Sequence, residues 1–204
     1  MEILQLNGKE FFRVLGKNQI NIKFLEKELD VVIKTSKEGE IRIEGKDPYK
    51  EYLCLEMIIA VSMGFNIETA LFLKNEENIL KTIHLKNLVK KSRIGPIKGR
   101  IIGTEGKSKR VIEDLTETAI VVNDNVVGII GASQNVEFAS AAIDMLIHGA
   151  PHSIVYKYLE KSRAKINEEL HLKEIIREDF LNPEKKKIKK KSIKKKSKKI
   201  SNRK

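Results

Sequence analysis

The sequence has little of what disulfide-stabilised, membrane or zinc-binding proteins contain. It has one cysteine, Cys54, among 204 residues, and no tryptophan. One thiol cannot close an internal disulfide and lacks the paired spacing of a zinc site, which favours a reducing compartment. No apolar run approaches the roughly 20 residues that a membrane span needs, and the opening "MEILQLNGKE" has no signal core. We expect a soluble, cytoplasmic protein that contacts no membrane.

Catalytic patterns are also missing. The four histidines are scattered without ligand spacing, and His148, near a predicted helix end, is more simply a cap or dipole partner. Glu113, Asp114 and Glu117 suggest an acidic metal site, but on a helix a solvated face beside basic residues is the simpler interpretation. No nucleotide-binding P-loop, Ser-His-Asp order or catalytic carboxylate pair is present. We therefore expect no enzyme activity, no metal and no cofactor.

Positive charge gathers at the end of the sequence. The formal net charge is +12, and residues 184–204 hold 13 Lys or Arg and one Glu, so the preceding residues sum to zero. A lysine run this dense cannot bury apolar surface, so we expect a disordered tail when the protein is free. The tail is interpreted as an arm that contacts RNA phosphates, or alternatively as a solvated run that only aids nonspecific attraction.

The apolar pattern predicts alternating short strands and helices. In the first half we expect strands at 2–6, 30–35 and 40–45 and helices at 9–15, 20–29 and 48–64, the last with Asp47 as N-cap. In the second half we expect a strand at 80–85, helices at 94–102, 107–116 and 135–148, and a hairpin over Asn123–Asn125. A helix over 152–178, capped by Ser153 and ended by Pro183, follows.

The two halves form a pseudo-repeat. A shift of 87 residues places Gly16 on Gly103, Gln19 on Gly106 and Ile33 on Ile120. The element order predicts an α+β fold of two βααββα units, each a three-stranded antiparallel sheet packed on helices and followed by a further helix. The predicted domains are 1–76, 77–163, a helical extension at 164–183 and the lysine-rich tail at 184–204.

The segment "GRIIGTEGKSKR" carries the strongest functional signal. Two glycines separated by two residues, between two helices of a βααββα unit, are typical of a type I KH domain, whose GxxG loop clamps four backbone nucleotides. Glycine lets phosphate and sugar approach the main chain, and the following helix N-terminus faces the anion. The predicted RNA-binding loop and its basic neighbours are Gly103, Thr104, Glu105, Gly106, Lys107, Lys109 and Arg110.

The same hypothesis predicts an apolar floor on which bases rest. Its residues come from the helix before the loop and from the strand after the second helix, namely Ile101, Ile102, Ile120, Val121 and Val122. The alternative is that Gly103 ends a helix and Gly106 eases a turn, with no ligand. In the first unit the loop is "GKNQ", where Gln19 replaces the second glycine. We expect weak or absent RNA clamping there and a scaffold or protein-binding role.

Residues 93–163 resemble the second KH domain of the partner-of-Nob-one family of ribosome-assembly factors. The resemblance is clearest in "GRIIGTEGKSKRVIEDLTETAIVV", "IIGASQNVEFA" and "GAPHSIVY". The first unit resembles the family's degenerate first KH domain, and a start directly in that unit is similar to archaeal members. Within the GTEG loop, Glu105 departs from the family's usual basic or polar residue and weakens phosphate attraction.

The resemblance implies a non-catalytic RNA-binding protein. It implies binding to single-stranded 16S rRNA near the 3′ end, and help with rRNA processing and 30S subunit assembly beside a Nob-one-type endonuclease. An alternative is a protein scaffold that contacts the alpha subunit of a translation initiation factor. Pro151, Ser153 and Tyr156 are interpreted as a helix start with a packed ring, or alternatively as a contact to rRNA or to the nuclease.

Overall fold

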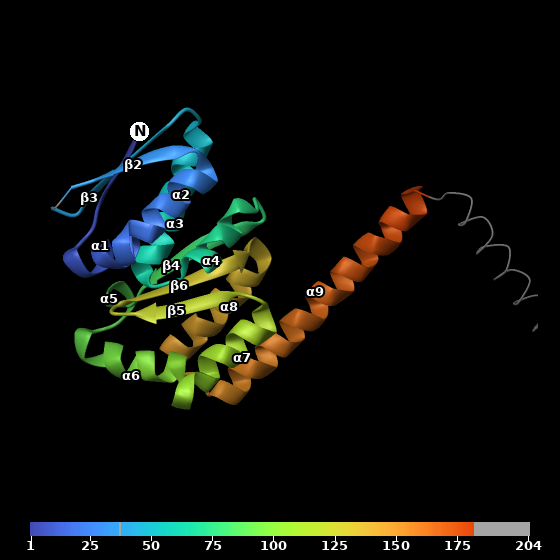
Figure 1. Cartoon of the computed structure of the whole chain (residues 1–204). Helices are drawn as coiled ribbons and strands as arrows, with labels where there is room; N and C mark the ends of the chain where they lie inside the picture. Colours follow the sequence, from blue (N-terminus) through green and yellow to red (C-terminus); the bar gives the residue numbers. More distant parts are fainter. Residues whose placement is uncertain (37, 182–204) are drawn as a thin grey trace, which may run out of the picture. The chain divides into compact units, whose positions relative to one another are not determined.

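The computed structural model describes residues 1–36 and 38–181. Within them the fold is α+β, with two three-stranded antiparallel sheets packed on helices (Figure 1). Both sheets belong to one compact unit, Met1–Leu159. Helix α9 (His152–Leu181) is the last described element, and no helix of the described part is long and apolar enough to cross a membrane. The predicted stop at Pro183 and the lysine-rich tail lie outside the described residues.

The first repeat follows the predicted βααββα order. Its sheet has the strand order β1-β3-β2, with antiparallel pairing throughout. The elements are β1 (Glu2–Gln5), α1 (Gly8–Leu15), α2 (Ile20–Leu29), β2 (Val31–Thr35), β3 (Glu40–Gly45), α3 (Pro48–Met63), α4 (Ile67–Ala70) and a 3-10 turn (Leu71–Lys74).

The second repeat has the same order, with sheet order β4-β6-β5. Its elements are β4 (Asn78–His84), α5 (Leu85–Leu88), α6 (Lys91–Ile102), α7 (Lys107–Thr116), β5 (Ala119–Asn123), β6 (Val126–Ala132) and α8 (Ser133–Ile147). The single-turn helix α5 was not predicted, because one turn shows no periodicity. Helix α6 begins three residues before the predicted start at 94, because its first turn is polar. The domain boundaries at residues 76 and 163 stay predictions.

Local capping explains both ends of α3. The Asp47 side chain accepts a hydrogen bond from the Tyr49 amide at 2.9 Å, and Pro48 occupies the first helical position of α3, as predicted. Gly64 ends that helix with φ 115°. The predicted cap of α9 is wrong, since Ser153 lies inside the first turn of that helix.

A side-chain bond that occurs in both repeats confirms the pseudo-repeat. In the first repeat, Glu26 on α2 accepts from the Ile33 amide on β2 at 2.9 Å. In the second, Glu113 on α7 accepts from the Ile120 amide on β5 at 2.8 Å. Both pairs are related by the shift of 87. The bond ties the second helix of each repeat to the strand that follows it.

The two sheets differ in how they are buried. Along β3 the burial alternates, as expected for a strand with one solvent-facing side. Along β6, five successive residues from Val127 to Gly131 are buried. Ile129 lies in the core of the second repeat, whereas Ile130 lies in the core of the first. The second sheet is therefore covered on both faces.

The outer face of the second sheet is covered by the C-terminal end of α3 and the residues after it (Figure 1). The Phe65 ring lies so close to Gly128 that a Cβ there would be 2.7 Å from Phe65 Cε2. Asn123 Nδ2 donates to the Met63 carbonyl at 3.0 Å. Ala119 and Val121 also pack against the first core. The first repeat thus covers the outer face of the second sheet.

Replacing Gly128 by Ala should destabilise the protein by about 1–3 kcal/mol, because the added methyl group overpacks a buried contact. Gly95→Ala is the control, since a Cβ at Gly95 meets nothing within 4 Å, and alanine in a helix should stabilise by about 0.5–1 kcal/mol. Chemical denaturation of both variants measures the difference. An unchanged free energy of unfolding for Gly128→Ala would contradict the close packing between the repeats.

Candidate nucleic-acid interface

The predicted loop is an exposed turn between α6 and α7. Gly103 ends α6 with φ 73° and ψ 175°, and its amide donates to the Gly99 carbonyl at 2.8 Å. Glu105 then takes φ 53° and Gly106 φ 74° before α7 begins at Lys107. Both φ values lie in the left-handed region, which glycine adopts without strain. Thr104 and Glu105 are exposed, so the turn is open to a ligand.

The two glycines have different physical roles. A Cβ on Gly103 would lie 2.7 Å from Ser108 Cβ and 2.8 Å from the Ser108 amide nitrogen, so only glycine fits there. A Cβ on Gly106 would meet nothing within 4 Å. Gly103 is therefore required by the fold itself. Gly106 leaves open space beside the main chain, which is where a sugar or phosphate can approach.

The first-repeat loop follows the same backbone path. Gly16 has φ 65° and ψ −178°, and Asn18 and Gln19 have φ 56° and 58°. These values correspond, residue by residue, to Gly103, Glu105 and Gly106. The loop geometry is thus retained without the second glycine, and the first repeat has a glutamine at the position of Gly106.

Two of the three predicted basic residues are free to meet a phosphate. Lys107 and Arg110 are exposed, and neither forms a salt bridge within residues 1–36 and 38–181. Lys109 instead places its Nζ 2.8 Å from both carboxylate oxygens of Glu113. Glu113 is in turn held by the Ile120 amide. Lys109 therefore belongs to an ion pair within α7, and its predicted contact with RNA stays a prediction.

The predicted apolar floor is also smaller than expected. Ile101 and Ile120 are buried in the second core, and Val121 packs on the first repeat. Ile102, Val121 and Val122 are half-buried, and Val122 packs against the second core. The reason is periodicity, because adjacent residues of a helix or strand point in different directions. The sequence pattern marked the apolar positions but did not show which side of the sheet was already covered.

Helix α6 has an exposed face without side chains at two positions, which was not predicted from the sequence. Gly95 and Gly99 are four residues apart, both are exposed, and a Cβ on either would meet nothing within 4 Å. Residues at this spacing lie on one helix face, which Ile102 extends toward the loop. Each glycine costs a helix interior about 1 kcal/mol relative to alanine. The pair was visible in the sequence and marks a stretch where another backbone can approach closely.

The "GAPHSIVY" segment holds α6 in place. Arg100 Nη2 donates to the Ala150 carbonyl at 2.7 Å, and His152 Nε2 lies 2.9 Å from the Arg100 carbonyl. The half-buried Tyr156 ring lies 6.1 Å from the His152 ring. The helix start with a packed ring is therefore what the structure contains. A contact of Pro151 and Ser153, both exposed, with rRNA or nuclease stays a prediction.

The remaining titratable candidates have structural surroundings. His148 Nδ1 lies 2.9 Å from the Asp144 carbonyl oxygen at the end of α8, which confirms the helix-end interpretation. In the described part of the chain, no three His, Cys, Asp or Glu side chains gather where they could hold a metal ion. Burial raises the pKa of the Cys54 thiol to about 12, so this sulfur stays protonated and unreactive.

Known relatives match most of the chain. The model of the second KH domain of PNO1, described as a eukaryotic type (type I) KH domain, matches residues 79–164. A KH domain-containing protein of Methanocaldococcus jannaschii is 37% identical over 171 residues, covering 81% of this chain and 75% of the relative. The RNA-binding protein pno1 of Ixodes scapularis is 30% identical, covering 78% and 67%. The pre-rRNA-processing protein pno1 of Schizosaccharomyces pombe is 30% identical, covering 61% and 53%.

Solved structures share the fold. A crystal structure from Aeropyrum pernix superposes with a TM-score of 0.82 at 30% identity, covering 86% of this chain and 97% of that one. A complex from Pyrococcus horikoshii contains aDim2p, the initiation-factor subunit a/eIF2alpha and rRNA. The match to that structure has a TM-score of 0.75 at 30% identity and covers 80% and 94% of the two chains.

Replacing Glu113 by Ala should destabilise the protein by about 1–3 kcal/mol, because the partly buried Ile120 amide loses its acceptor. Glu76→Ala, on an exposed turn, is the control and should stay within about 0.5 kcal/mol of the parent. Urea denaturation measures both. Equal stability of the two variants would show that this hydrogen bond does not hold α7 to β5.

Proposed function

Because the chain belongs to the PNO1 (Dim2) family of KH-domain proteins, we propose that it binds single-stranded 16S rRNA near the 3′ end through its second repeat. In this role it assists rRNA processing and assembly of the 30S subunit beside an endonuclease of the Nob-one type, and it catalyses no bond change itself. Relatives carry the names RNA-binding protein and pre-rRNA-processing protein. The fold and those names support the proposal.

The observation that carries the proposal is the open backbone at Gly106. No side chain caps the N-terminus of α7 there, so the first amides of that helix have no side-chain acceptor from the cap residue. A phosphate in the free space beside Gly106 would accept from these amides and meet the positive end of the helix dipole. Lys107 and Arg110 flank the same place. The exposed Glu105 carboxylate opposes this attraction and limits the affinity.

The arrangement supports positioning of RNA rather than chemistry on it. The interface offers amides, two free cations and a strip of exposed helix backbone, and these bind a sugar-phosphate chain without activating a nucleophile. Holding a single strand in a fixed register would present the cleavage site to the endonuclease. The endonuclease itself supplies the catalytic groups in this proposal.

Replacing Gly106 by Gln should weaken binding of an RNA oligonucleotide that copies the 16S 3′ end by at least about tenfold, or about 1.4 kcal/mol. Gln19 shows that this backbone path accepts glutamine, so the variant should fold. The matched control is Gln19→Gly in the first repeat, which should leave affinity unchanged. Fluorescence anisotropy at moderate salt measures both, and equal affinities of Gly106→Gln and the parent would refute the assigned loop.

Salt dependence should separate the free cations from the paired one. Replacing Lys107 or Arg110 by Ala should lower the slope of log affinity against log salt by about 0.7 each, the value for one phosphate contact on a single strand. Lys109→Ala should change the slope little, because its charge is matched by Glu113. A titration series from low to high salt measures this. A loss for Lys109→Ala as large as for Lys107→Ala would contradict the assignment.

A second candidate function, contact with an initiation-factor alpha subunit, is favoured by the first repeat. The shift of 87 places Phe12 on Gly99 and Ile20 on Lys107, so apolar side chains replace the open and basic positions of the RNA face. Phe12 is 71% exposed and Ile20 63% exposed. Exposed apolar side chains beside a loop without its second glycine suit a protein partner. The Pyrococcus complex contains an a/eIF2alpha subunit with aDim2p and rRNA.

The double variant Phe12→Ser, Ile20→Lys should weaken binding of the organism's own initiation-factor alpha subunit by at least about tenfold, as expected for losing buried apolar area. Its affinity for RNA should not change. Phe72→Ser, at another exposed phenylalanine of the first repeat, is the control. Titration calorimetry measures the affinities. If the double variant binds the alpha subunit as tightly as the parent, the first repeat does not bind it through Phe12 and Ile20.

A further inference from the structure

The last turn of α6 leads directly into the glycine loop and needs bonding partners from outside the helix. The bond that closes the helix runs from the Gly103 amide to the Gly99 carbonyl at 2.8 Å. The carbonyl of Arg100 comes one residue later, among the last four carbonyls of the helix, for which a helix offers no amide of its own. The position of the loop therefore depends on what bonds to Arg100.

The start of α9 supplies the missing partner. His152 Nε2 lies 2.9 Å from the Arg100 carbonyl oxygen. Because a carbonyl oxygen only accepts, Nε2 carries the proton and donates it to this bond. The Arg100 side chain bonds in the other direction, since its Nη2 donates to the Ala150 carbonyl at 2.7 Å. Two hydrogen bonds thus join one residue of α6 to the segment 150–152.

The segment that holds Arg100 is itself fixed on the second core. The Ala150 amide donates to the Met145 carbonyl of α8 at 2.9 Å. Val155, in the first turn of α9, is fully buried in the second core. The Tyr156 ring lies beside the His152 ring, with the ring centroids 6.1 Å apart. The imidazole is therefore held in place before any ligand binds.

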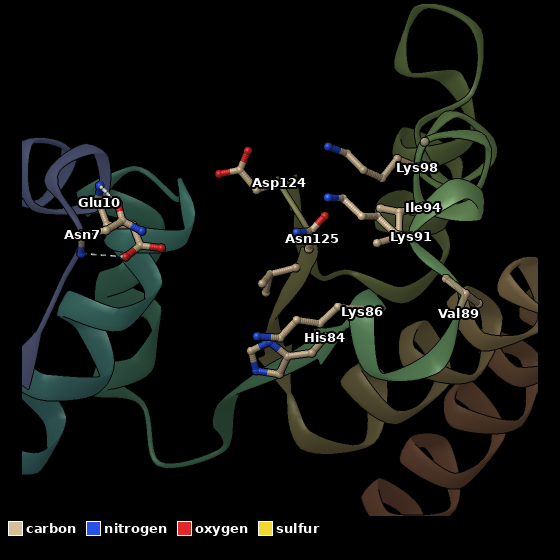
Figure 2. A pocket seen from close by; sticks show the side chains of 12 residues that line it. Asn7, Glu10, His84, Lys86, Val89, Lys91, Ile94, Lys98, Asp124 and Asn125 are labelled. Carbon is tan, nitrogen blue, oxygen red and sulfur yellow. Dashed lines mark hydrogen bonds between the residues drawn. The ribbon is translucent and has the colours of Figure 1, made fainter.

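The opposite side of α6 borders an open cleft of ≈ 930 Å³, lined by Lys86 on α5 and by Lys91 and Lys98 on α6, among others. Figure 2 shows the Lys91 and Lys98 side chains extending from α6 toward this space. Lys98 and Arg100 are two residues apart, which corresponds to about 200° around a helix axis. The bonds at Arg100 therefore support the end of α6 on the side away from the cleft.

We propose that His152 is a positioning residue for the RNA-binding loop. Its bond to the Arg100 carbonyl holds the end of α6, and through it the turn from Gly103 to Gly106, in the path that a phosphate meets. The inference rests on the proposed function and deepens it, because it makes the start of α9 a determinant of RNA affinity without a contact to RNA. A loop that loses this support has to be ordered again on binding, and this ordering costs affinity.

The test compares two uncharged replacements in the full chain. His152→Leu removes the donor, whereas the side-chain amide of His152→Gln can donate to the same carbonyl. Affinity for an RNA oligonucleotide that copies the 16S 3′ end should fall by roughly three- to tenfold in His152→Leu and stay within about twofold of the parent in His152→Gln. Fluorescence anisotropy measures the affinities at a temperature where circular dichroism shows every variant folded.

The control for a general loss of packing is Phe138→Leu. The Phe138 ring on α8 packs edge-on against the Tyr158 ring of α9, with centroids 6.4 Å apart, and takes no part in the bonds at Arg100. This variant should lower the free energy of unfolding and leave RNA affinity within about twofold of the parent.

A double variant shows whether His152 acts through the loop. Gly106→Gln already removes the loop contact, so adding His152→Leu should lower affinity by less than about twofold more. Hydrogen exchange gives an independent measurement without RNA. The amides of residues 103–107 should exchange faster in His152→Leu than in the parent, because local opening is easier.

The outcomes separate this inference from the proposed function. If Gly106→Gln weakens binding but His152→Leu binds as tightly as the parent, the inference is overturned and the proposed function stands. Equal losses in His152→Leu and Phe138→Leu, or in His152→Leu and His152→Gln, would also overturn it. So would a full additional loss in the double variant. Binding that ignores Gly106→Gln would refute the proposed function itself.

Discussion

The second sheet depends on apolar cover from both sides. Strand β6 buries five successive residues, so one face packs on the helices of its own repeat and the other requires α3 and Phe65 of the first repeat. Exposing that face would place Ile130 and its neighbours in water, at roughly 25 cal/mol per Å² of apolar surface. The first repeat is thus retained as structure, whatever its own loop binds. Because α3 covers that face of the sheet, the proposed RNA site is confined to the loop after α6 and the exposed residues beside it.

The two repeats contain similar loops that differ at the position of the second glycine. Both keep the same dihedral path and the same glutamate bond to the next strand. The first glycine of each loop has a positive φ that strains other residues, and at Gly103 a Cβ would also lie 2.8 Å from the Ser108 amide nitrogen. The position of the second glycine has no such neighbour in the second repeat, so its identity is free to follow function. Glutamine there fills the space, and glycine leaves it open.

For RNA binding, the position of each charged side chain matters more than the net charge of the protein. All of the formal net charge of +12 lies in residues 184–204, and the preceding residues sum to zero. Within the body, Lys109 is neutralised by Glu113, whereas Lys107 and Arg110 are left free beside the loop. Lys86, Lys91 and Lys98 extend the same side of the second repeat toward the cleft. A body whose charges sum to zero can therefore still place unpaired cations side by side.

The sequence by itself determined the element order, the repeat, the α3 cap at Asp47 and Pro48, and the glycine loop, because each depends on neighbours within a few residues or on simple periodicity. It also carried an unused signal, the unbroken apolar run of β6, which is typical of a strand buried on both faces. Only the tertiary structure decided that Val121 faces the first repeat, that Lys109 is paired, and that Ile101 and Ile120 are core. Those outcomes depend on which surfaces meet across the fold, and contacts between distant segments leave no local pattern in the chain.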